Sequence, residues 1–423
     1  MMGTVSALEG FSPATRQWFE GAFAAPTSAQ EGAWSAAQAG RNALVVAPTG
    51  SGKTLAAFLW ALDRLAAEPV PDEPRHRCRV LYVSPLKALA VDVQRNLRSP
   101  LTGIRQAAQR LGDPVPDITV GMRTGDTPAD ERRQFARTPP DVLVTTPESL
   151  FLLLTSAARE SLRGVRTIIV DEVHAVAGTK RGAHLALSLE RLEEIVAPDL
   201  LAGSGDQHRS PQRIGLSATV RPVDEVSTFL SGARPVEIVQ PPSAKTINVQ
   251  VQVPVPDLAA LDERPAPGST DEEVVGSAAG TAQKPSIWPA VEQRLLELVR
   301  AHRSTIVFSN SRRLAERLTS RLNELAAEEA EQQEAVGLDG SGPRSAFPAE
   351  AVGQSGVGGG AAPTVAKAHH GSMSRDQRTL VEEELKSGVL PCVVATSSLE
   401  LGIDMGAVDL VVQIEAPPSV ASG

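Results

Sequence analysis

Eight short apolar runs, rich in valine and isoleucine, constrain the fold of this 423-residue chain more than any other feature of its sequence. Each run is nearly continuously apolar, which is typical of strands buried on both faces of a parallel sheet. Amphipathic helical patterns lie between the runs, at residues 53–67 and 288–303 for example, and this alternation predicts an α/β fold. The runs are ALVVAP (43–48), RVLYVSP (79–85), DVLVTTP (141–147), RTIIVDE (166–172), RIGLSAT (213–219), STIVFSN (304–310), CVVATS (392–397) and DLVVQIE (409–415).

The runs fall into two groups, which predicts two α/β domains with parallel sheets. Residues 1–240 hold five runs, and residues 286–423 hold three. Residues 241–285 are expected to form a linker and an acidic insertion. This segment includes an alternating stretch, residues 246–255, that predicts a strand leaving the first domain. Residues 328–366 are expected to form a second insertion, a charged helix end followed by glycine-rich sequence without a fixed structure.

The net charge of −9 does not exclude nucleic acid as a partner. Residues 257–285 carry a charge of −4 and residues 328–366 carry −5, so the rest of the chain is neutral. No apolar run approaches the roughly 18 residues of a membrane span, and the first residues show no secretory signal. The two cysteines, Cys78 and Cys392, lie far apart, which favours a reducing cytoplasm over a disulfide framework.

The segment Ala47–Thr54, APTGSGKT, follows a predicted buried strand and opens a predicted helix. A glycine-rich loop in this position is typical of a phosphate-binding loop, because its backbone N–H groups and the helix N-terminus face the phosphates. ATP and Mg²⁺ are the expected ligands. Lys53 is expected to reach the β- and γ-phosphates, and Thr54 to bind Mg²⁺. The other expected nucleotide-binding residues of the loop are Thr49, Gly50, Ser51 and Gly52.

Two adjacent acids end the run at 166–172, and a histidine follows shortly after them. Asp171 is predicted to hold Mg²⁺, and Glu172 to orient and deprotonate the attacking water. His174 is predicted to couple this site to the segment around Ser217, or to contact the nucleotide. With Lys53, these three residues form the predicted catalytic set.

The motifs APTGSGKT, SPLKALAVDVQRNL, TTPESL, DEVH, LSAT, VFSNSRR and ATSSLELGIDMG occur in the order of the superfamily 2 helicase motifs. The segments VAGTKRGAHLALSLERL and HRSTIVFSNSRRLAERL resemble the large helicase-related (Lhr) family most. The resemblance covers nearly the whole chain except the two insertions. It implies two tandem RecA-like domains of the P-loop NTPase class and a DEAD/DEAH-box-like, ATP-dependent helicase.

The resemblance also implies roles for residues outside the phosphate loop. Gln30 would read adenine, and Trp18 or Phe19 would stack on the base or pack in the core. Ser217, Ala218 and Thr219 would couple hydrolysis to domain movement, while Gly402 and Asp404 would contact nucleotide from the second domain. The implied nucleic-acid contacts are Ser84, Pro85, Lys87, Arg123, Thr124, Gly125, Asp126, Thr146, Pro147, Glu148, Asn310, Arg312, Thr396 and Ser397.

The family's last arginine motif should follow residue 415, but no arginine does so before Gly423. We therefore expect an N-terminal part of a longer helicase with an incomplete second domain, which binds ATP but hydrolyses it weakly. The family resemblance implies 3′-to-5′ movement on single-stranded DNA or unwinding of DNA-containing duplexes, in repair. An RNA-directed helicase stays open as an alternative, as does a non-catalytic module that binds ATP and nucleic acid.

Overall fold

This computed structural model describes residues 7–48, 50–85, 87–202, 210–218, 220–242, 248–255, 286–337, 364–396, 399 and 408–416. The chain divides into two compact units, Met1–Thr246 and Ile247–Gly423. Within the described residues, no helix is both long enough and apolar enough to cross a membrane.

The first unit is built on a seven-stranded sheet in the order β3-β4-β2-β5-β6-β1-β7, and all its neighbouring strands are parallel. The sheet is a doubly covered one, because each of its two faces lies against its own hydrophobic core. The strands are β1 (Asn42–Val46), β2 (Val80–Val83), β3 (Val120–Arg123), β4 (Val142–Thr145), β5 (Thr167–Val170), β6 (Gln212–Ser217) and β7 (Val236–Val239).

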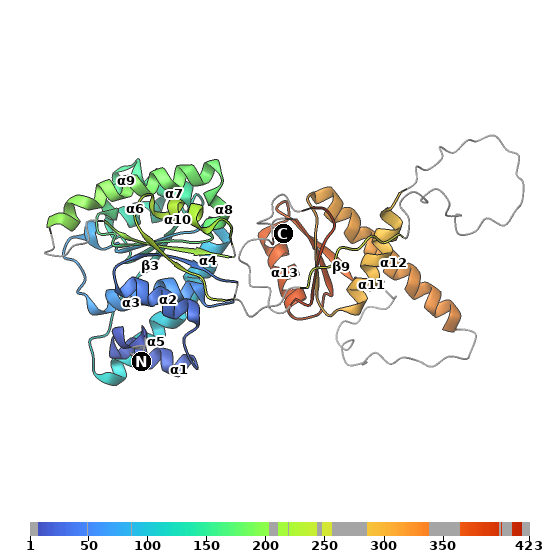
Figure 1. Cartoon of the computed structure of the whole chain (residues 1–423), viewed down its shortest axis with the longest axis horizontal. Helices are drawn as coiled ribbons and strands as arrows, with labels where there is room; N and C mark the ends of the chain where they lie inside the picture. The colour runs from blue at the N-terminus through green and yellow to red at the C-terminus, as the bar shows by residue number, and fades with distance from the viewer. Residues whose placement is uncertain are drawn as a thin grey trace, which may run out of the picture. The chain divides into compact units, whose positions relative to one another are not determined.

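Helices cover both faces of this sheet (Figure 1). The face with α7, α8, α9 and α10 buries Leu44, Leu81 and Leu143, and the face with α2 and α3 buries Val45, Tyr82 and Val144. Alternate residues of each strand therefore enter opposite cores, as pleating requires. The helices are α1 (Pro13–Ala22), α2 (Ser28–Gln38), α3 (Lys53–Ala67), α4 (Lys87–Asn96), α5 (Arg98–Leu111), α6 (Ala129–Arg137), α7 (Pro147–Leu154), α8 (Val173–Ala177), α9 (Lys180–Ala202) and α10 (Val223–Ser231).

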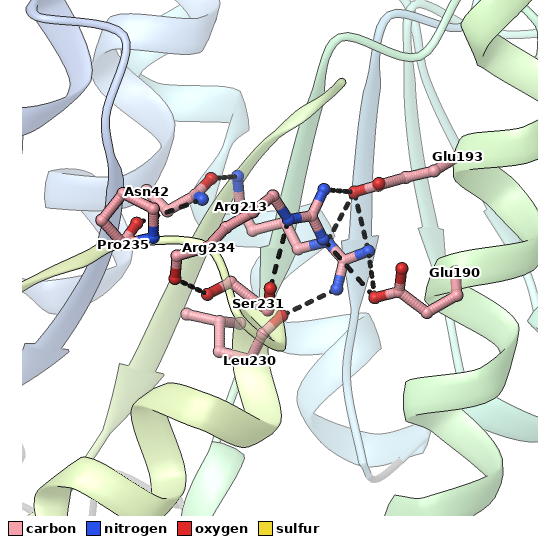
Figure 2. A network of polar contacts seen from close by, with 8 residues as sticks. All are labelled: Asn42, Glu190, Glu193, Arg213, Leu230, Ser231, Arg234 and Pro235. Carbon is pink, nitrogen blue, oxygen red and sulfur yellow. Dashed lines mark hydrogen bonds and ion pairs between the residues drawn. The ribbon is translucent and has the colours of Figure 1, made fainter. Parts of the chain in front are cut away.

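Figure 2 shows a polar network at the amino end of β6, opposite the end that carries the functional motifs. Arg213 is only 1% exposed, and its guanidinium donates to Glu190 at 2.9 Å, to Glu193 at 2.7 Å and to the Leu230 carbonyl at 2.9 Å. Arg234 donates to the same two glutamates. A buried guanidinium needs hydrogen-bond acceptors for its donors. Because the acceptors of Arg213 lie on α9 and α10, the network joins these two helices to β6.

The second unit contains a four-stranded parallel sheet in the order β11-β8-β10-β9. Its strands and helices are β8 (Thr305–Phe308), β9 (Ala366–His369), β10 (Cys392–Ala395), β11 (Leu410–Gln413), α11 (Trp288–Ala301), α12 (Arg312–Gly337) and α13 (Arg375–Lys386). Asn323 of α12 accepts the N–H groups of Val365 and Ala366 at 2.9 and 3.0 Å and donates to the Ala366 carbonyl at 3.0 Å. This side chain therefore fixes the start of β9 against α12.

The α/β fold with parallel sheets is confirmed, and all eight predicted strands are present. The strand predicted at 246–255 is wrong, because its described residues 248–255 are irregular and Val249 and Val251 are 83% and 93% exposed. Alternation alone does not make a strand, because a strand also has to pair with a neighbour. The predicted second insertion begins inside α12, which continues to Gly337, and its residues 338–363 lie outside the described residues.

Candidate functional site

The predicted motifs of the first unit all follow the carboxyl ends of its strands, which lie along one edge of the sheet because the strands are parallel. Val83 of β2 is level with Val170 of β5 and Thr145 of β4, and Thr145 is level with Arg123 of β3. The loops after β1 and β5 carry predicted ATP residues, and the end of β6 with the loop after it carries the predicted coupling residues. The loops after β2, β4 and β3 carry the predicted nucleic-acid residues, and β5, which carries the acidic pair, is next to β2 of that group.

The phosphate loop turns sharply into α3. Gly50 and Gly52 both have φ of +80°, a conformation that glycine adopts without strain. Lys53 is the first residue of α3, and its Nζ donates to the Ala47 carbonyl at 2.5 Å. The buried Ser51 hydroxyl has no hydrogen-bond partner within the described part of the chain. A left-handed glycine turn, an unpartnered hydroxyl and the N-terminus of a 15-residue helix fit a phosphate group.

Asp171 and Glu172 follow β5 directly, and each is 8% exposed. Glu172 has φ of 43° and ψ of 49°, and it is the only non-glycine residue with positive φ among those the structure describes. Its N–H donates to Oδ1 of Asp171 at 2.9 Å. A left-handed glutamate is a strained residue, and such strain concentrates at functional sites.

The two carboxylates and Lys53 perturb one another's pKa values. Burial, and then the charge of Glu172, raises the pKa of Asp171 to about 6. Burial also raises the pKa of Glu172, although the nearby Lys53 opposes the shift. Burial lowers the pKa of Lys53 despite both carboxylates. Desolvation therefore dominates all three pKa shifts. Clusters of perturbed pKa values of this kind are typical of functional sites.

Tyr82 is a site residue that the sequence reasoning missed. Its hydroxyl donates to Oδ2 of Asp171, and its ring stacks on Phe58 of α3 at 5.0 Å. A buried tyrosine in an otherwise aliphatic strand signals that its hydroxyl has a partner. The sequence does not say which partner, because that depends on the register of β2 against β5.

His174 joins the acidic segment to the end of β6. Its Nδ1 accepts the main-chain N–H of Ala218 at 3.3 Å and lies 3.1 Å from the Ser217 hydroxyl. Burial, and then the charge of Lys53, lowers the pKa of His174. The 3.4 Å distance from Nδ1 to Glu172 is therefore not an ion pair, because an Nδ1 that accepts hydrogen bonds carries no proton. Thr219 lies outside the described residues.

Gln30 contacts the phosphate loop in this structure. Its Oε1 accepts the Thr27 N–H at 2.9 Å in a capping box, and its Nε2 donates to the Gly52 carbonyl at 3.5 Å. Phe19 is 1% exposed in a core cluster with Trp34, so it packs and does not stack on a base. Trp18 lines a groove between α1 and α5 that no residue of the phosphate loop lines.

The predicted nucleic-acid residues after β2 and β4 differ in exposure. Ser84 is fully buried, whereas Lys87 begins α4 and pairs with Asp126 at 2.7 Å on the surface. Pro147 occupies the first turn of α7, and the exposed Glu148 there is held by Arg181, whose hydrogen bond lowers the pKa of Glu148. Thr146, the N-cap of α7, donates through its hydroxyl to Ser149 at 3.1 Å.

The segment after β3 forms a tight turn. The Thr124 N–H donates to the Thr127 hydroxyl at 2.8 Å, and the Gly125 carbonyl accepts from Arg132 at 2.8 Å. The guanidinium of Arg123 lies 5.5 Å from the Phe135 ring centroid. Burial, and then the charge of Arg132, lowers the pKa of Arg123.

In the second unit, the Asn310 side chain donates to the Ala416 carbonyl at 2.8 Å, and Arg312 donates to Ser372. The Thr396 N–H donates to the His369 carbonyl at 3.1 Å. His369, which is fully buried, lies 3.0 Å from a carboxylate oxygen of Glu382. The predicted residues Thr49, Ser397, Gly402 and Asp404 lie outside the described residues.

Magnesium would be held by few protein groups at this site. Among the residues that the structure describes, no cluster of three or more His, Cys, Asp or Glu side chains can hold a metal ion. Mg²⁺ in nucleotide sites is bound through one or two carboxylates together with substrate phosphates. Asp171 at the end of β5 and Thr54 in the first turn of α3 fit that smaller requirement.

Two family models match the chain. The model described as DEAD/DEAH box helicase matches residues 27–226, and the model described as helicase conserved C-terminal domain matches residues 363–422. Their order along the chain follows the two units of the structure.

Similar proteins are known as sequences and as a structure. The chain is 61% identical to "Lhr helicase/ probable uracil glycosylase" of Mycolicibacterium smegmatis and 52% identical to "Lhr helicase/uracil glycosylase" of Escherichia coli, over 98% of this chain in each case. It spans only 25% and 26% of the length of those relatives. A structure of Mycobacterium smegmatis helicase Lhr bound to ssDNA and AMP-PNP matches 99% of this chain and 46% of that one, with 57% identity and a TM-score of 0.72.

Proposed function

The chain belongs to the large helicase-related (Lhr) family of superfamily 2 DEAD/DEAH-box helicases, and we propose that it forms the ATP-driven part of a motor that moves along single-stranded nucleic acid. One observation carries the proposal. The phosphate loop, the Asp171–Glu172 pair and the contact of His174 with Ser217 all lie at one edge of a single sheet. The proposed strand-contacting loops follow the neighbouring strands at the same edge.

The proposed hydrolysis uses groups that this site holds in place. Lys53 would leave the Ala47 carbonyl and bind the β- and γ-phosphates, with backbone N–H groups of Gly50–Gly52 beside it. Glu172 would accept the proton of the attacking water. Its raised pKa supports this role, because a general base works best when its pKa approaches the working pH.

Mg²⁺ held by Thr54 and Asp171 would neutralise charge on the phosphates. The buried setting of Asp171 supports this assignment, since a cation would compensate the repulsion between the two adjacent carboxylates.

The proposed polymer substrate is single-stranded DNA or a DNA-containing duplex, with 3′-to-5′ movement and a role in repair. A relative with 57% identity has been solved with ssDNA bound, which supports DNA. The proposed contacts are hydroxyls, backbone amides and a few cations, so binding should depend on salt and little on sequence.

The free, buried thiols of Cys78 and Cys392 support the expected reducing cytoplasm.

ATP hydrolysis by this chain, measured with and without a single-stranded 25-nucleotide DNA, tests the proposal. We expect stimulation by the strand in the unmodified chain, loss of ATP binding in Lys53→Ala, and retained binding without hydrolysis in Glu172→Gln. Lys386→Ala and Glu20→Gln, which change exposed residues of the same types in α13 and α1, are the matched controls. ATP binding that survives Lys53→Ala would contradict the proposed nucleotide site.

A competition assay separates DNA from RNA as the substrate. A labelled DNA strand bound to the chain is displaced by unlabelled DNA or RNA of the same sequence. We expect DNA to compete better; equal or better competition by RNA would favour the RNA-directed alternative. Strand binding without any stimulated hydrolysis would favour the non-catalytic binding module.

A further inference from the structure

Tyr82 links β2, the strand before the proposed Ser84–Lys87 contacts, to the carboxylate proposed to hold the metal. Its side chain is fully buried, and its ring lies at an interplanar angle of 27° to Phe58 of α3. The hydroxyl donates to Oδ2 of Asp171, whereas Oδ1 of Asp171 accepts the Glu172 N–H at 2.9 Å. Each oxygen of this carboxylate therefore has its own fixed donor.

Two donors on different oxygens fix the plane of a carboxylate. The terminal torsion of an aspartate is otherwise broad, because rotation about the bond to its sp² carbon has a low barrier. An ionised carboxylate offers about four acceptor sites, so these two hydrogen bonds leave room for a further ligand. The Tyr82 donor is itself held rigidly, because its ring is packed between the sheet and Phe58.

The Tyr82 hydroxyl is not needed to fill space in the core. The other residues of β2 are Val80, Leu81 and Val83, all buried and aliphatic, and a phenylalanine ring would fill the same space as the tyrosine ring. Burying a hydroxyl costs free energy unless it finds a partner. The partner it finds is the carboxylate of Asp171.

We propose that Tyr82 is a positioning residue, which orients the Asp171 carboxylate for the magnesium-bound nucleotide. The inference rests on the proposed function, in which Asp171 holds the metal. The strand before the Ser84–Lys87 loop would then contribute to metal-dependent nucleotide binding through Asp171.

Nucleotide affinity of the full chain with and without Mg²⁺ tests the inference. A fluorescent ADP analogue is titrated into the unmodified chain and Tyr82→Phe, first with Mg²⁺ and then with EDTA. We expect the gain in affinity that Mg²⁺ confers to fall about tenfold in Tyr82→Phe, as for other residues that orient a metal ligand, with affinity in EDTA unchanged.

Two control variants separate positioning from stability. Ser188→Ala removes another buried hydroxyl, which donates to the His184 carbonyl at 2.9 Å within α9, and should leave the Mg²⁺ gain unchanged. Phe58→Leu removes the stacked ring but keeps the Tyr82 hydroxyl. It should lower the melting temperature at least as much as Tyr82→Phe while reducing the Mg²⁺ gain less.

The outcomes distinguish the inference from the function on which it rests. If Asp171→Asn abolishes the Mg²⁺ gain but Tyr82→Phe does not reduce it, Tyr82 only packs and the inference is overturned, while the proposed function stands. An equal loss of Mg²⁺ gain in Phe58→Leu and Tyr82→Phe also overturns the inference. If Asp171→Asn keeps the full gain, the metal role of Asp171 fails and the inference fails with it.

Discussion

The Nδ1 atom of His174 lies 3.1 Å from the Ser217 hydroxyl and accepts the Ala218 N–H at 3.3 Å. His174 follows the proposed water-activating glutamate by two residues, and Ser217 ends β6. One imidazole ring therefore connects the acidic segment to the end of β6. Burial lowers the pKa of His174, which favours the neutral ring whose Nδ1 accepts the Ala218 N–H.

His174→Ala should uncouple hydrolysis from strand binding. We expect ATP affinity to stay within about twofold and strand stimulation of hydrolysis to fall about tenfold, a typical coupling free energy. The measurement is the hydrolysis rate across a titration of single-stranded DNA. Ser217→Ala, which leaves the Ala218 N–H in place, should lose less. A fall in ATP affinity equal to the fall in stimulation would argue against a coupling role.

Gly52 and Gly50 make a matched pair for the phosphate loop. Both have φ of +80°, so alanine at either position carries the same backbone cost of about 1–2 kcal/mol. A Cβ at Gly50 meets nothing within 4 Å, whereas one at Gly52 would lie 2.6 Å from Nε2 of Gln30. Gly52→Ala should therefore weaken ATP binding more than Gly50→Ala, as measured by calorimetric titration. Equal losses would mean that Gln30 has no part in shaping the loop.

Asp171→Asn should stabilise the nucleotide-free first unit at pH 8. The pKa of Asp171 is about 6 in the folded chain against an ordinary value of 3.8, so the folded state binds more protons between these values. The stability contributed by its protonation is full below pH 3.8 and is lost as pH rises through 6. Removing the charge should therefore raise the free energy of unfolding by up to about 3 kcal/mol at pH 8.

The measurement is urea unfolding followed by tryptophan fluorescence in a Trp288→Phe background. The other tryptophans, Trp18, Trp34 and Trp60, all lie in the first unit, so the signal then reports that unit alone. The gain should shrink steadily as the pH is lowered from 8 to 4. A gain that is independent of pH would show that the carboxylate charge is not its source.

Arg213→Met should destabilise the first unit by about 3 kcal/mol, because the Leu230 carbonyl loses the Arg213 donor and Glu193 keeps only Arg234 as its partner among the described residues. The guanidinium is nearly inaccessible, and Glu193 is only 16% exposed at its side chain. The double variant Arg213→Met with Glu193→Leu should recover part of the loss, since it also removes the carboxylate that has lost one of its two arginine partners. Chemical denaturation of the single and double variants measures this. No recovery in the double variant would mean that packing, and not charge, causes the loss.

The positions of the helices and strands around the proposed site were predicted correctly where a pattern is local. The phosphate loop, the Asp171–Glu172 pair and the helix Lys53–Ala67 are contiguous segments, and their neighbours in the chain identify them. Sequence reasoning missed β3, β7 and β9, all of which are edge strands. An edge strand is less buried than a central one, so VGMR, VEIV and AKAH lack the continuous apolar run that marks the others.

The contacts that depend on register were beyond sequence reasoning. Tyr82 and Asp171 are 89 residues apart, and their hydrogen bond exists only because β2 pairs with β5 at Val83 and Val170. Arg213 likewise meets Glu190 and Glu193 because the fold brings α9 near the start of β6. Without the tertiary structure, the sequence does not say which partner the side chain of either residue has.

One strand, β6, carries the buried Arg213 near its first residue and Ser217 at its last. The two residues are four steps apart along the strand, which separates them by roughly 13 Å. A library of variants of this strand, sorted once for expression level and once for strand-stimulated turnover, should therefore give two enrichment maps that peak at opposite ends. Stability and strand-stimulated turnover would then depend on opposite ends of the same six-residue strand.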